Sequence, residues 1–227
     1  MNRRAGIPRG GDFIAEIRRY VERDATQVGV LIADTYGEFN LAEMAPGKRA
    51  SMLGPFAFAY SSMPAHRTAI SEAIAAPSVC VAERDGVVVG VLRGGRTDHR
   101  GRTVLSSLFV AAQHHDRGIG RALVERFEQE YTARGASVFS LSATVYAVPF
   151  YLSVGYKKTT GLRSAHSFGE PGLPYQPMKK VVENERWVGR SPLQYPRQTA
   201  VSPGSDPAMA YVGVDQHAQH RWADTCL

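Results

Sequence analysis

The sequence predicts an α/β fold, a single domain in which a mixed, mostly antiparallel central sheet is flanked by helices. Two observations support this prediction. First, two β-rich runs, SVCVAER and VVVGVLRGGR, flank Asp85-Gly86, a dipeptide typical of a tight hairpin turn. Second, the strand-like run TVLSSLFV is followed by a helical pattern and then by the strand-like run SVFSLSA. A strand–helix–strand order requires a crossover connection and therefore predicts one parallel pair.

The elements before this hairpin are predicted from apolar spacing. We expect a first strand over residues 13–20 and a helix over residues 26–40, with Asp24 as a helix N-cap. A second helical stretch between residues 46 and 76 contains prolines, so we expect it to be broken into pieces. The apolar positions of the first helix recur at helical spacing: Val28, Leu31, Ile32, Tyr36 and Phe39.

The elements after the hairpin carry the crossover. We expect a third strand over residues 103–110, a loop, and a helix that ends at Gly135, followed by a strand over residues 137–143. A short helix over residues 148–153 should end at Gly155. The helix after the loop has one apolar stripe, made of Ile119, Ala122, Leu123, Phe127 and Tyr131.

The C-terminal part is less regular. We expect two final strands, over residues 156–160 and 178–182, joined by a Gly/Pro-rich loop. Periodicity stops after Val182, and prolines recur, so we expect residues 183–227 to be a disordered tail. The domain itself is predicted over residues 12–182. The joining loop contains Gly169, Pro171, Gly172 and Pro174.

Composition excludes several classes of protein. The chain has 227 residues, a net charge of +6 and 44% hydrophobic residues, which is close to the share in globular proteins. No apolar run approaches the roughly 18–20 residues of a membrane-spanning helix, so we expect no membrane partner. Basic residues are scattered among acidic ones without long runs, so we expect no nucleic-acid partner. The positive charge indicates only that some anion is bound.

Two features bear on the cellular compartment of the protein: its two cysteines and its first residues. Cys80 and Cys226 lie far apart, without the paired spacing of a disulfide framework or a cysteine zinc site. This usage suggests a reducing compartment, and we expect a cytoplasmic protein. The basic start is followed by Pro8 and two glycines, where a signal peptide would be apolar. We therefore expect residues 1–11 to be a flexible arm.

The loop between the third strand and the long helix carries the chemistry. It reads VAAQHHDRGIGR, with Gly118 and Gly120 where the helix begins. The unpaired amides of a helix start, together with the helix dipole, bind phosphate groups. A Walker A loop is excluded because Arg121, not Lys, follows Gly120, and a dinucleotide fingerprint is excluded because Leu123 stands where a third glycine is needed. A plain tight turn stays open on the loop alone.

Four segments together resemble the GNAT superfamily of acyl-CoA-dependent N-acyltransferases, over about residues 13–182. They are IRRYVERDATQVGVLIADTY, VAERDGVVVGVLRG, LFVAAQHHDRGIGRALV and AVPFYLSVGYKK. They resemble the first strand and helix of the family, its central hairpin, its acetyl-CoA motif (Gln/Arg-x-x-Gly-x-Gly/Ala) and its Phe-Tyr signature. Each is weak alone, but their joint order is specific.

The resemblance implies acetyl-CoA as co-substrate. The backbone of Leu108, Phe109 and Val110 would pair with the pantetheine arm, and this strand would splay from the next to open a slot for the thioester. The pyrophosphate would lie on the amides of the loop and helix start. These residues are His115, Asp116, Arg117, Gly118, Ile119, Gly120 and Arg121.

The resemblance also implies a mechanism, an N-acetyltransferase in which a primary amine attacks the acetyl group directly. The N–H of Leu108 would stabilise the oxyanion, and Tyr151 would protonate the departing thiolate. A tyrosine suits this role because its ordinary pKa, about 10, exceeds that of a thiol, about 8.5. For Tyr151, core packing with a bonded hydroxyl is the other interpretation.

The acceptor amine is not identified by the sequence. Tyr36, Phe39 and Asn40 could shape its pocket, although core packing is favoured slightly for the two aromatic residues. The base that would deprotonate the amine is also open, and many members of the family pair as dimers, which leaves a homodimer open. The candidates for the base are Glu38, Glu43, His66 and His166.

Two departures from the family pattern matter. His115 stands at the Gln/Arg position of the loop motif, and we expect binding to survive because backbone amides do most of the phosphate work. Val104 stands where some members keep a basic carboxylate, which motivates an alternative, an acyl-CoA-binding sensor without turnover. No metal is expected. The loosely metal-like group near the C-terminus falls in the predicted tail, where chance spacing is the better interpretation; it comprises His217, His220, Asp224 and Cys226.

Overall fold

The computed structural model describes residues 15–167 and 170–182, with the side chains of residues 165–172 left out. The predicted arm, the predicted tail and the His217/His220 group lie outside these residues. The described chain forms one eight-stranded sheet in the order β1-β2-β3-β4-β5-β8-β6, with β7 paired to β8. The strands are β1 Glu16–Arg19, β2 Ser78–Arg84, β3 Val87–Thr97, β4 Thr103–Val110, β5 Val138–Thr144, β6 Lys157–Lys158, β7 Arg163–Ser167 and β8 Glu170–Val181.

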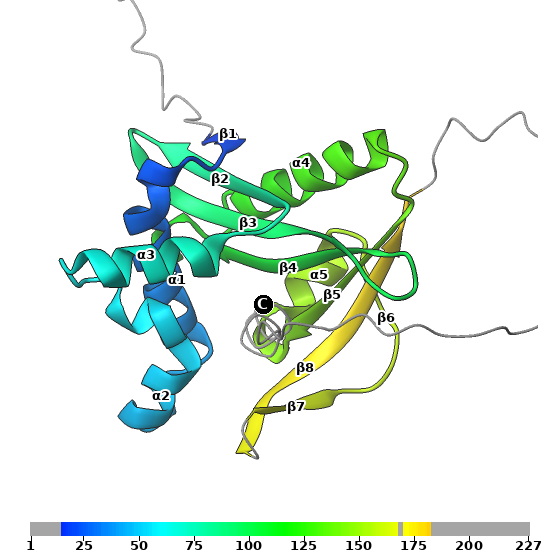
Figure 1. The fold of residues 1–227 in the computed structure, drawn as a ribbon. Helices are drawn as coiled ribbons and strands as arrows, with labels where there is room; N and C mark the ends of the chain where they lie inside the picture. Colours follow the sequence, from blue (N-terminus) through cyan, green and yellow to red (C-terminus); the bar gives the residue numbers. More distant parts are fainter. Residues whose placement is uncertain (1–14, 168–169, 183–227) are drawn as a thin grey trace, which may run out of the picture.

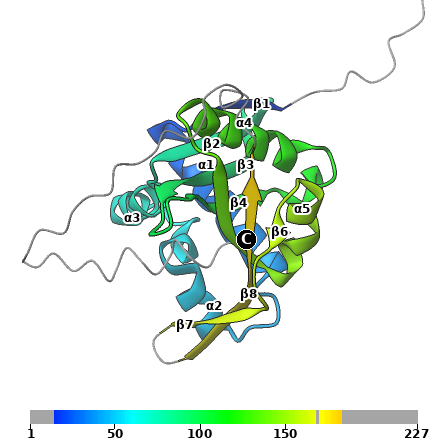
Figure 2. The ribbon, with the colours of Figure 1, turned by 90° about the vertical axis from the view of Figure 1, so that its right-hand side faces the viewer.

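Helices cover both faces of the sheet, as Figures 1 and 2 show. Tyr36 of α1 packs edge-on against Phe109 of β4, with ring centroids 6.1 Å apart. On the opposite face, Leu123 of α4 lies against Gly90 of β3, so close that a Cβ there would be 3.0 Å from it. The helices are α1 Ala25–Phe39, α2 Pro46–Leu53, α3 Pro64–Ile74, α4 Ile119–Ala133 and α5 Val148–Ser153, with short 3-10 turns η1 Glu22–Asp24, η2 Gly54–Phe58, η3 Ala112–His114 and η4 Val145–Ala147.

The predicted α/β class and the mixed, mostly antiparallel sheet are confirmed. All strand pairs are antiparallel except β4 with β5, the pair that the crossover order predicts. The predicted hairpin, the long helix and the helix over residues 148–153 are all present. The stretch between residues 46 and 76 is broken as expected, with Pro46 and Pro64 each in the first turn of a new helix.

The Gly/Pro-rich loop predicted before the last strand is wrong within the described residues. Its position is taken by the end of β7 and the first half of β8. Pro171 and Pro174 pair with residues of β7, in a stretch where no second described strand pairs with β8. Proline cannot donate to a ladder, but on an edge ribbon the missing donor costs little.

Asp24 stands at the N-cap position of α1, as predicted, but its side chain does not cap the helix. Its carboxylate instead binds the guanidinium of Arg18, with N···O distances of 2.7 and 2.8 Å, and accepts the amide of Val21. Arg18 also binds Glu83 of β2. The ion pair between Asp24 and Arg18 therefore connects β1 to the start of α1.

The parallel pair is short, and this positions the site. β4 and β5 pair only at Thr103 with Phe139 and at Val104 with Ser140. Beyond Val104 the two strands separate, so the rest of β4 has no described partner on its β5 side. Figure 2 shows β4 and β8 between α5 on one side and α3 on the other.

Candidate functional site

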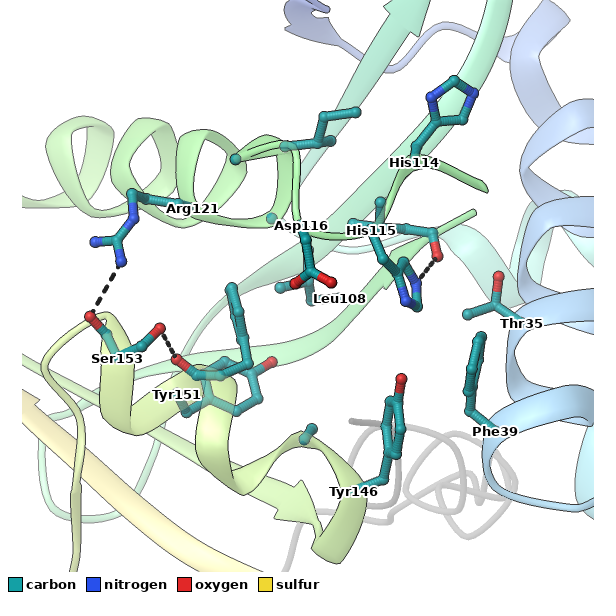
Figure 3. Close-up of a pocket in the computed structure, with 16 residues that line it drawn as sticks. Thr35, Phe39, Leu108, His114, His115, Asp116, Arg121, Tyr146, Tyr151 and Ser153 are labelled. Carbon is teal, nitrogen blue, oxygen red and sulfur yellow. Dashed lines mark hydrogen bonds between the residues drawn. The ribbon is translucent and has the colours of Figure 1, made fainter. Parts of the chain in front are cut away.

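A cavity of about 580 Å³ lies where β4 and β5 separate (Figure 3). It lies between elements from both faces of the sheet, with α1 on one side and the start of α4 together with α5 on the other. Its walls combine apolar and aromatic side chains with a few polar groups, as small-molecule sites do. The lining residues are Thr35, Phe39, Leu108, Val110, His114, His115, Asp116, Gly118, Ile119, Gly120, Arg121, Tyr146, Ala147, Phe150, Tyr151 and Ser153.

The β4–α4 loop presents a series of open backbone amides to this cavity. Among the described residues, the amides of 116–121 donate no backbone hydrogen bond, and Ala122 is the first that does, to Gly118 at 2.9 Å. Gly118 is the N-cap of α4 and has φ +79°, a left-handed conformation that suits glycine. Open amides and the positive end of the helix dipole make this loop a ready site for a phosphate or pyrophosphate.

Gly120 lets the start of α4 approach the opposite wall. A Cβ at Gly120 would lie 3.1 Å from two ring atoms of Phe150 and 3.8 Å from Leu108. Any larger residue would push α4 away from α5 at this point. The second glycine of the loop therefore has a packing role beside the amide that it exposes.

The three charged side chains of the loop have different surroundings. Arg121 donates to the carbonyl of Ser153 at 3.2 Å and so ties α4 to the end of α5, while Arg117 is exposed. Asp116 has φ +58°, unusual for a residue with a side chain, and Figure 3 shows its carboxylate pointing into the cavity. A negative charge thus stands within the loop whose open amides suit an anion.

The two adjacent histidines point in different directions (Figure 3). The His115 ring nitrogen Nε2 donates to the carbonyl of Val110 at 2.7 Å, and its ring lies 5.0 Å from that of Phe39. The His114 ring points away from the cavity, and burial, helped by Arg117, lowers its pKa. Among the described residues, no three His, Cys, Asp or Glu side chains gather into a metal site.

An aromatic wall lies on the α1 side of the cavity. Phe39 stacks on Tyr146 of η4, with ring centroids 4.9 Å apart and planes at 21°. The His115 ring is tilted by 32° against that of Phe39, so three rings from the end of α1, the β4–α4 loop and η4 form one cluster. Burial raises the pKa of Tyr146, and the carboxylates of Asp116 and Glu38 raise it further.

Tyr151 lies on the other side of the cavity, in α5. It is fully buried and lines the cavity, with Phe150 and Tyr156 packed edge-on against its ring at centroid distances of 5.1 and 5.6 Å. Its backbone carbonyl accepts the amide of Tyr156 at 3.0 Å. These contacts fix the ring in one orientation.

The predicted acceptor residues have different positions. Phe39 lines the cavity. Tyr36 packs in the core against Phe109, and Tyr36 and Phe109 are both outside the lining. Asn40 is outside the lining too, and its side-chain nitrogen is buried with no hydrogen-bond partner among the described residues. On β4, Leu108 and Val110 line the cavity, since they lie on the opposite strand face to Phe109.

The candidates for the general base lie outside the lining. Glu38 and Glu43 are exposed. His66 stacks on Phe58 and bonds to the hydroxyl of Ser61 at 2.7 Å, in the η2–α3 region. His166 is in β7, and its side chain is outside the described part.

Several lining residues were not predicted. Thr35 precedes Phe39 by four residues, so helical spacing alone could have placed it on the same helix face. Tyr146 is in a 3-10 turn after β5, for which the sequence has no periodic signal. The remaining unpredicted residues belong to the loop start, η4 and α5: His114, Ala147, Phe150 and Ser153.

Comparison with known proteins gives matches over the same region. The profile of the acetyltransferase (GNAT) domain family matches residues 51–182, more than half of the chain. YjcF, an uncharacterized N-acetyltransferase of Bacillus subtilis (strain 168), is 33% identical over 92 residues, which make up 40% of this chain and 61% of that protein. The match therefore spans less than two thirds of that relative's length.

Solved structures show the same fold. A GCN5-related N-acetyltransferase from Rhodopseudomonas palustris superposes with a TM-score of 0.58 at 20% identity, over 74% of this chain and 96% of that chain. The PaiA N-acetyltransferase from Thermoplasma acidophilum, solved in complex with coenzyme A, gives a TM-score of 0.54 at 15% identity, over 73% of this chain and 98% of that chain. Fold and profile agree with the resemblance seen in the sequence, and the chain belongs to the GNAT acetyltransferase family.

Proposed function

We propose that this protein transfers an acetyl group from acetyl-CoA to a primary amine. The observation that carries the proposal is the run of open amides at residues 116–121, at the edge of a cavity that also contains the buried Tyr151. A family relative of the same fold is solved with coenzyme A, which supports the choice of co-substrate.

The chain fits acetyl-CoA at three points. The open amides of the loop suit the pyrophosphate. The unpaired edge of β4 from Leu105 to Val110 suits the amide groups of a pantetheine arm, as in strand addition. The cavity beyond it suits the acetyl group and an amine.

Three groups would then act on the reaction. The amine nitrogen forms a bond to the acetyl carbon while the C–S bond breaks, and the N–H of Leu108 stabilises the negative charge on the carbonyl oxygen. The amine nitrogen loses one proton, and the coenzyme A sulfur gains one. Tyr151 would supply the proton to the sulfur. The base that takes the amine proton is not assigned.

Activity with a panel of amines tests this proposal. The protein is incubated with acetyl-CoA and primary amines of different size and charge, and free coenzyme A thiol is followed. We expect thiol release that depends on the amine, and N-acetylated product by mass spectrometry. Absence of release with every amine would contradict the proposal.

A binding role without turnover is the second candidate. Val104 is an apolar residue at the strand position where a basic carboxylate could stand, and Asp116 is the only carboxylate among the described lining residues. Calorimetry separates the two functions. Tight binding of acetyl-CoA, with no thiol release against any amine, would favour the sensor.

A further inference from the structure

The α1 side of the cavity differs electrostatically from the loop side. Phe39 and Tyr146 present ring surface there, and Tyr146 is 52% exposed. Aromatic faces carry partial negative charge and attract cations. The loop side, in contrast, consists of open amides at the positive end of α4.

Two carboxylates add to the negative side. Glu38 is exposed and lies three residues after Thr35, so helical spacing places it beside that lining residue on α1. The carboxylate of Asp116 points into the cavity from the loop (Figure 3). Burial raises the pKa of the Tyr146 hydroxyl, and the negative charges of both carboxylates raise it further.

Two arginines near this wall have other contacts, and Arg117, next to Asp116, is exposed. Arg121 is tied to the carbonyl of Ser153 on the α5 side. Arg49 packs against Gly37, where a Cβ would be 2.6 Å from its guanidinium. Gly37 is two residues from Thr35, which places Arg49 on the opposite face of α1 from the cavity.

A buried polar group also faces this end of the cavity. Thr35 is 5% exposed as a residue and lines the cavity. Its hydroxyl is a polar group to which a ligand with a hydrogen-bond donor can bond.

We propose that the acceptor is a small aliphatic amine with a second, positively charged group, bound between the Phe39–Tyr146 wall and the carboxylates of Glu38 and Asp116. The inference rests on the proposed function, because it names the acceptor of the same reaction. One amine reacts in its neutral form, and the other stays protonated against the aromatic wall. Coenzyme A and the acceptor would then have opposite charges at opposite ends of one cavity.

Three amines of equal chain length test the inference: putrescine with an ammonium end, pentylamine with a methyl end, and γ-aminobutyrate with a carboxylate end. Two quantities are measured for each, kcat/KM with acetyl-CoA and the Kd for the protein loaded with coenzyme A. We expect putrescine to exceed pentylamine by about tenfold in both, as an aromatic and carboxylate site for a cation predicts. γ-Aminobutyrate should be the poorest of the three.

The variants Glu38→Gln and Glu125→Gln form a matched pair. Glu125 is exposed on α4 and is not among the lining residues. Glu38→Gln should reduce the putrescine preference about threefold, in kcat/KM and in Kd, whereas Glu125→Gln should leave it unchanged. Loss of activity in Glu38→Gln that is equal for all three amines would assign Glu38 to deprotonation and would overturn the inference.

The failures of the two proposals are distinguishable. Turnover of all three amines at similar rates, or a preference for pentylamine or γ-aminobutyrate, overturns the inference and leaves acetyl transfer in place. Selective binding of putrescine without turnover supports the cation site and contradicts the transferase proposal. Equal binding of the three amines overturns the inference whether or not turnover occurs.

Discussion

Tyr151 combines full burial with a position in the cavity wall. A hydroxyl that donates a proton in the transition state contributes typically about 10²–10⁴-fold to the rate. Tyr151→Phe should therefore lower kcat by about 10²-fold or more and change the Kd for acetyl-CoA little. Steady-state kinetics and calorimetry on the same variant measure the two quantities.

Tyr131→Phe is the matched control for this prediction. Tyr131 is also a buried tyrosine, but it lies in α4 outside the cavity lining. Its variant should retain the rate of the wild type. If Tyr151→Phe retains it too, at neutral and at alkaline pH, Tyr151 is not the acid.

Asp116 places a negative charge in a loop that is proposed to bind an anion. Its removal in Asp116→Asn should tighten coenzyme A binding by about two- to fivefold, the range of an exposed charge interaction of about 0.5–1 kcal/mol. Calorimetry at two salt concentrations is the measurement, since the gain should shrink at high salt. Weaker binding in Asp116→Asn would mean that the carboxylate holds the loop in its conformation.

At the scale of elements, the effect of the left-handed glycine at the start of α4 on stability can be measured separately from its effect on coenzyme A binding. Gly118 (φ +79°) and Gly86 (φ +78°) have nearly the same φ angle, and a Cβ on either would meet no atom within 4 Å. Each Gly→Ala variant should lower the free energy of unfolding by about 1 kcal/mol, because a left-handed alanine is strained. Denaturant titration measures this loss.

Coenzyme A affinity then distinguishes the two variants. Gly86 is in the β2–β3 turn, away from the cavity, and Gly86→Ala should bind coenzyme A as the wild type does. Gly118→Ala should bind it more weakly, since the open amides depend on this conformation. Equal affinity in both variants would contradict a role of the α4 start in binding.

The elements that could be predicted from sequence have strong local signals. The Asp85-Gly86 turn, the apolar stripe of α4 and the Phe-Tyr helix α5 were all predicted within a residue or two of their observed bounds. The β7–β8 hairpin was missed because Pro171 and Pro174 argue against a strand unless it is known to lie on an edge. Asp24 was predicted to cap α1 from its residue type and position. Its ion pair with Arg18 could not be predicted, because it depends on how the chain folds.

The same distinction applies to the candidate site. The loop over residues 115–121 has a local glycine signature and was predicted. The aromatic wall was missed in part, because Tyr146 meets Phe39 only after the chain has formed four strands and three α-helices between them. Core packing was slightly favoured for both Tyr36 and Phe39; it holds for Tyr36, whose ring packs on Phe109, whereas Phe39 lines the cavity, a distinction that requires the exact rotation of α1.

At the scale of the whole molecule, one ion-pair group connects distant parts of the chain. Arg18 of β1 binds Asp24 before α1 and Glu83 of β2. The hydrogen bond from Arg18 is the main reason why the pKa of Asp24 is lowered. A lowered pKa means that the carboxylate stabilises the fold above its ordinary pKa of about 3.9, and that this contribution is lost as pH falls through the lowered value.

Asp24→Asn should lower the free energy of unfolding by about 2 kcal/mol at pH 7, the usual cost of losing a hydrogen-bonded charge. The difference from the wild type should shrink below about pH 4, because the wild-type carboxylate then becomes protonated as well. Asp85→Asn is the control, since the side chain of Asp85 is 78% exposed. A pH-independent deficit in Asp24→Asn would contradict the assignment.

The molecule as a whole is a sheet that separates between β4 and β5, with helices on both faces around the opening. Among the described residues, no helix is long and apolar enough to cross a membrane. The separation leaves one strand edge and one helix start open to the same cavity. We propose that coenzyme A occupies this opening with its pyrophosphate on the α4 start.

Amide chemical shifts, followed by NMR while coenzyme A is added, test this claim most directly. The account predicts the largest shifts at the amides of residues 116–121 and of Leu108 to Val110, with small shifts in the β2–β3 turn and in α3. Shifts that are largest elsewhere in the described chain, with the α4 start unchanged, would contradict it.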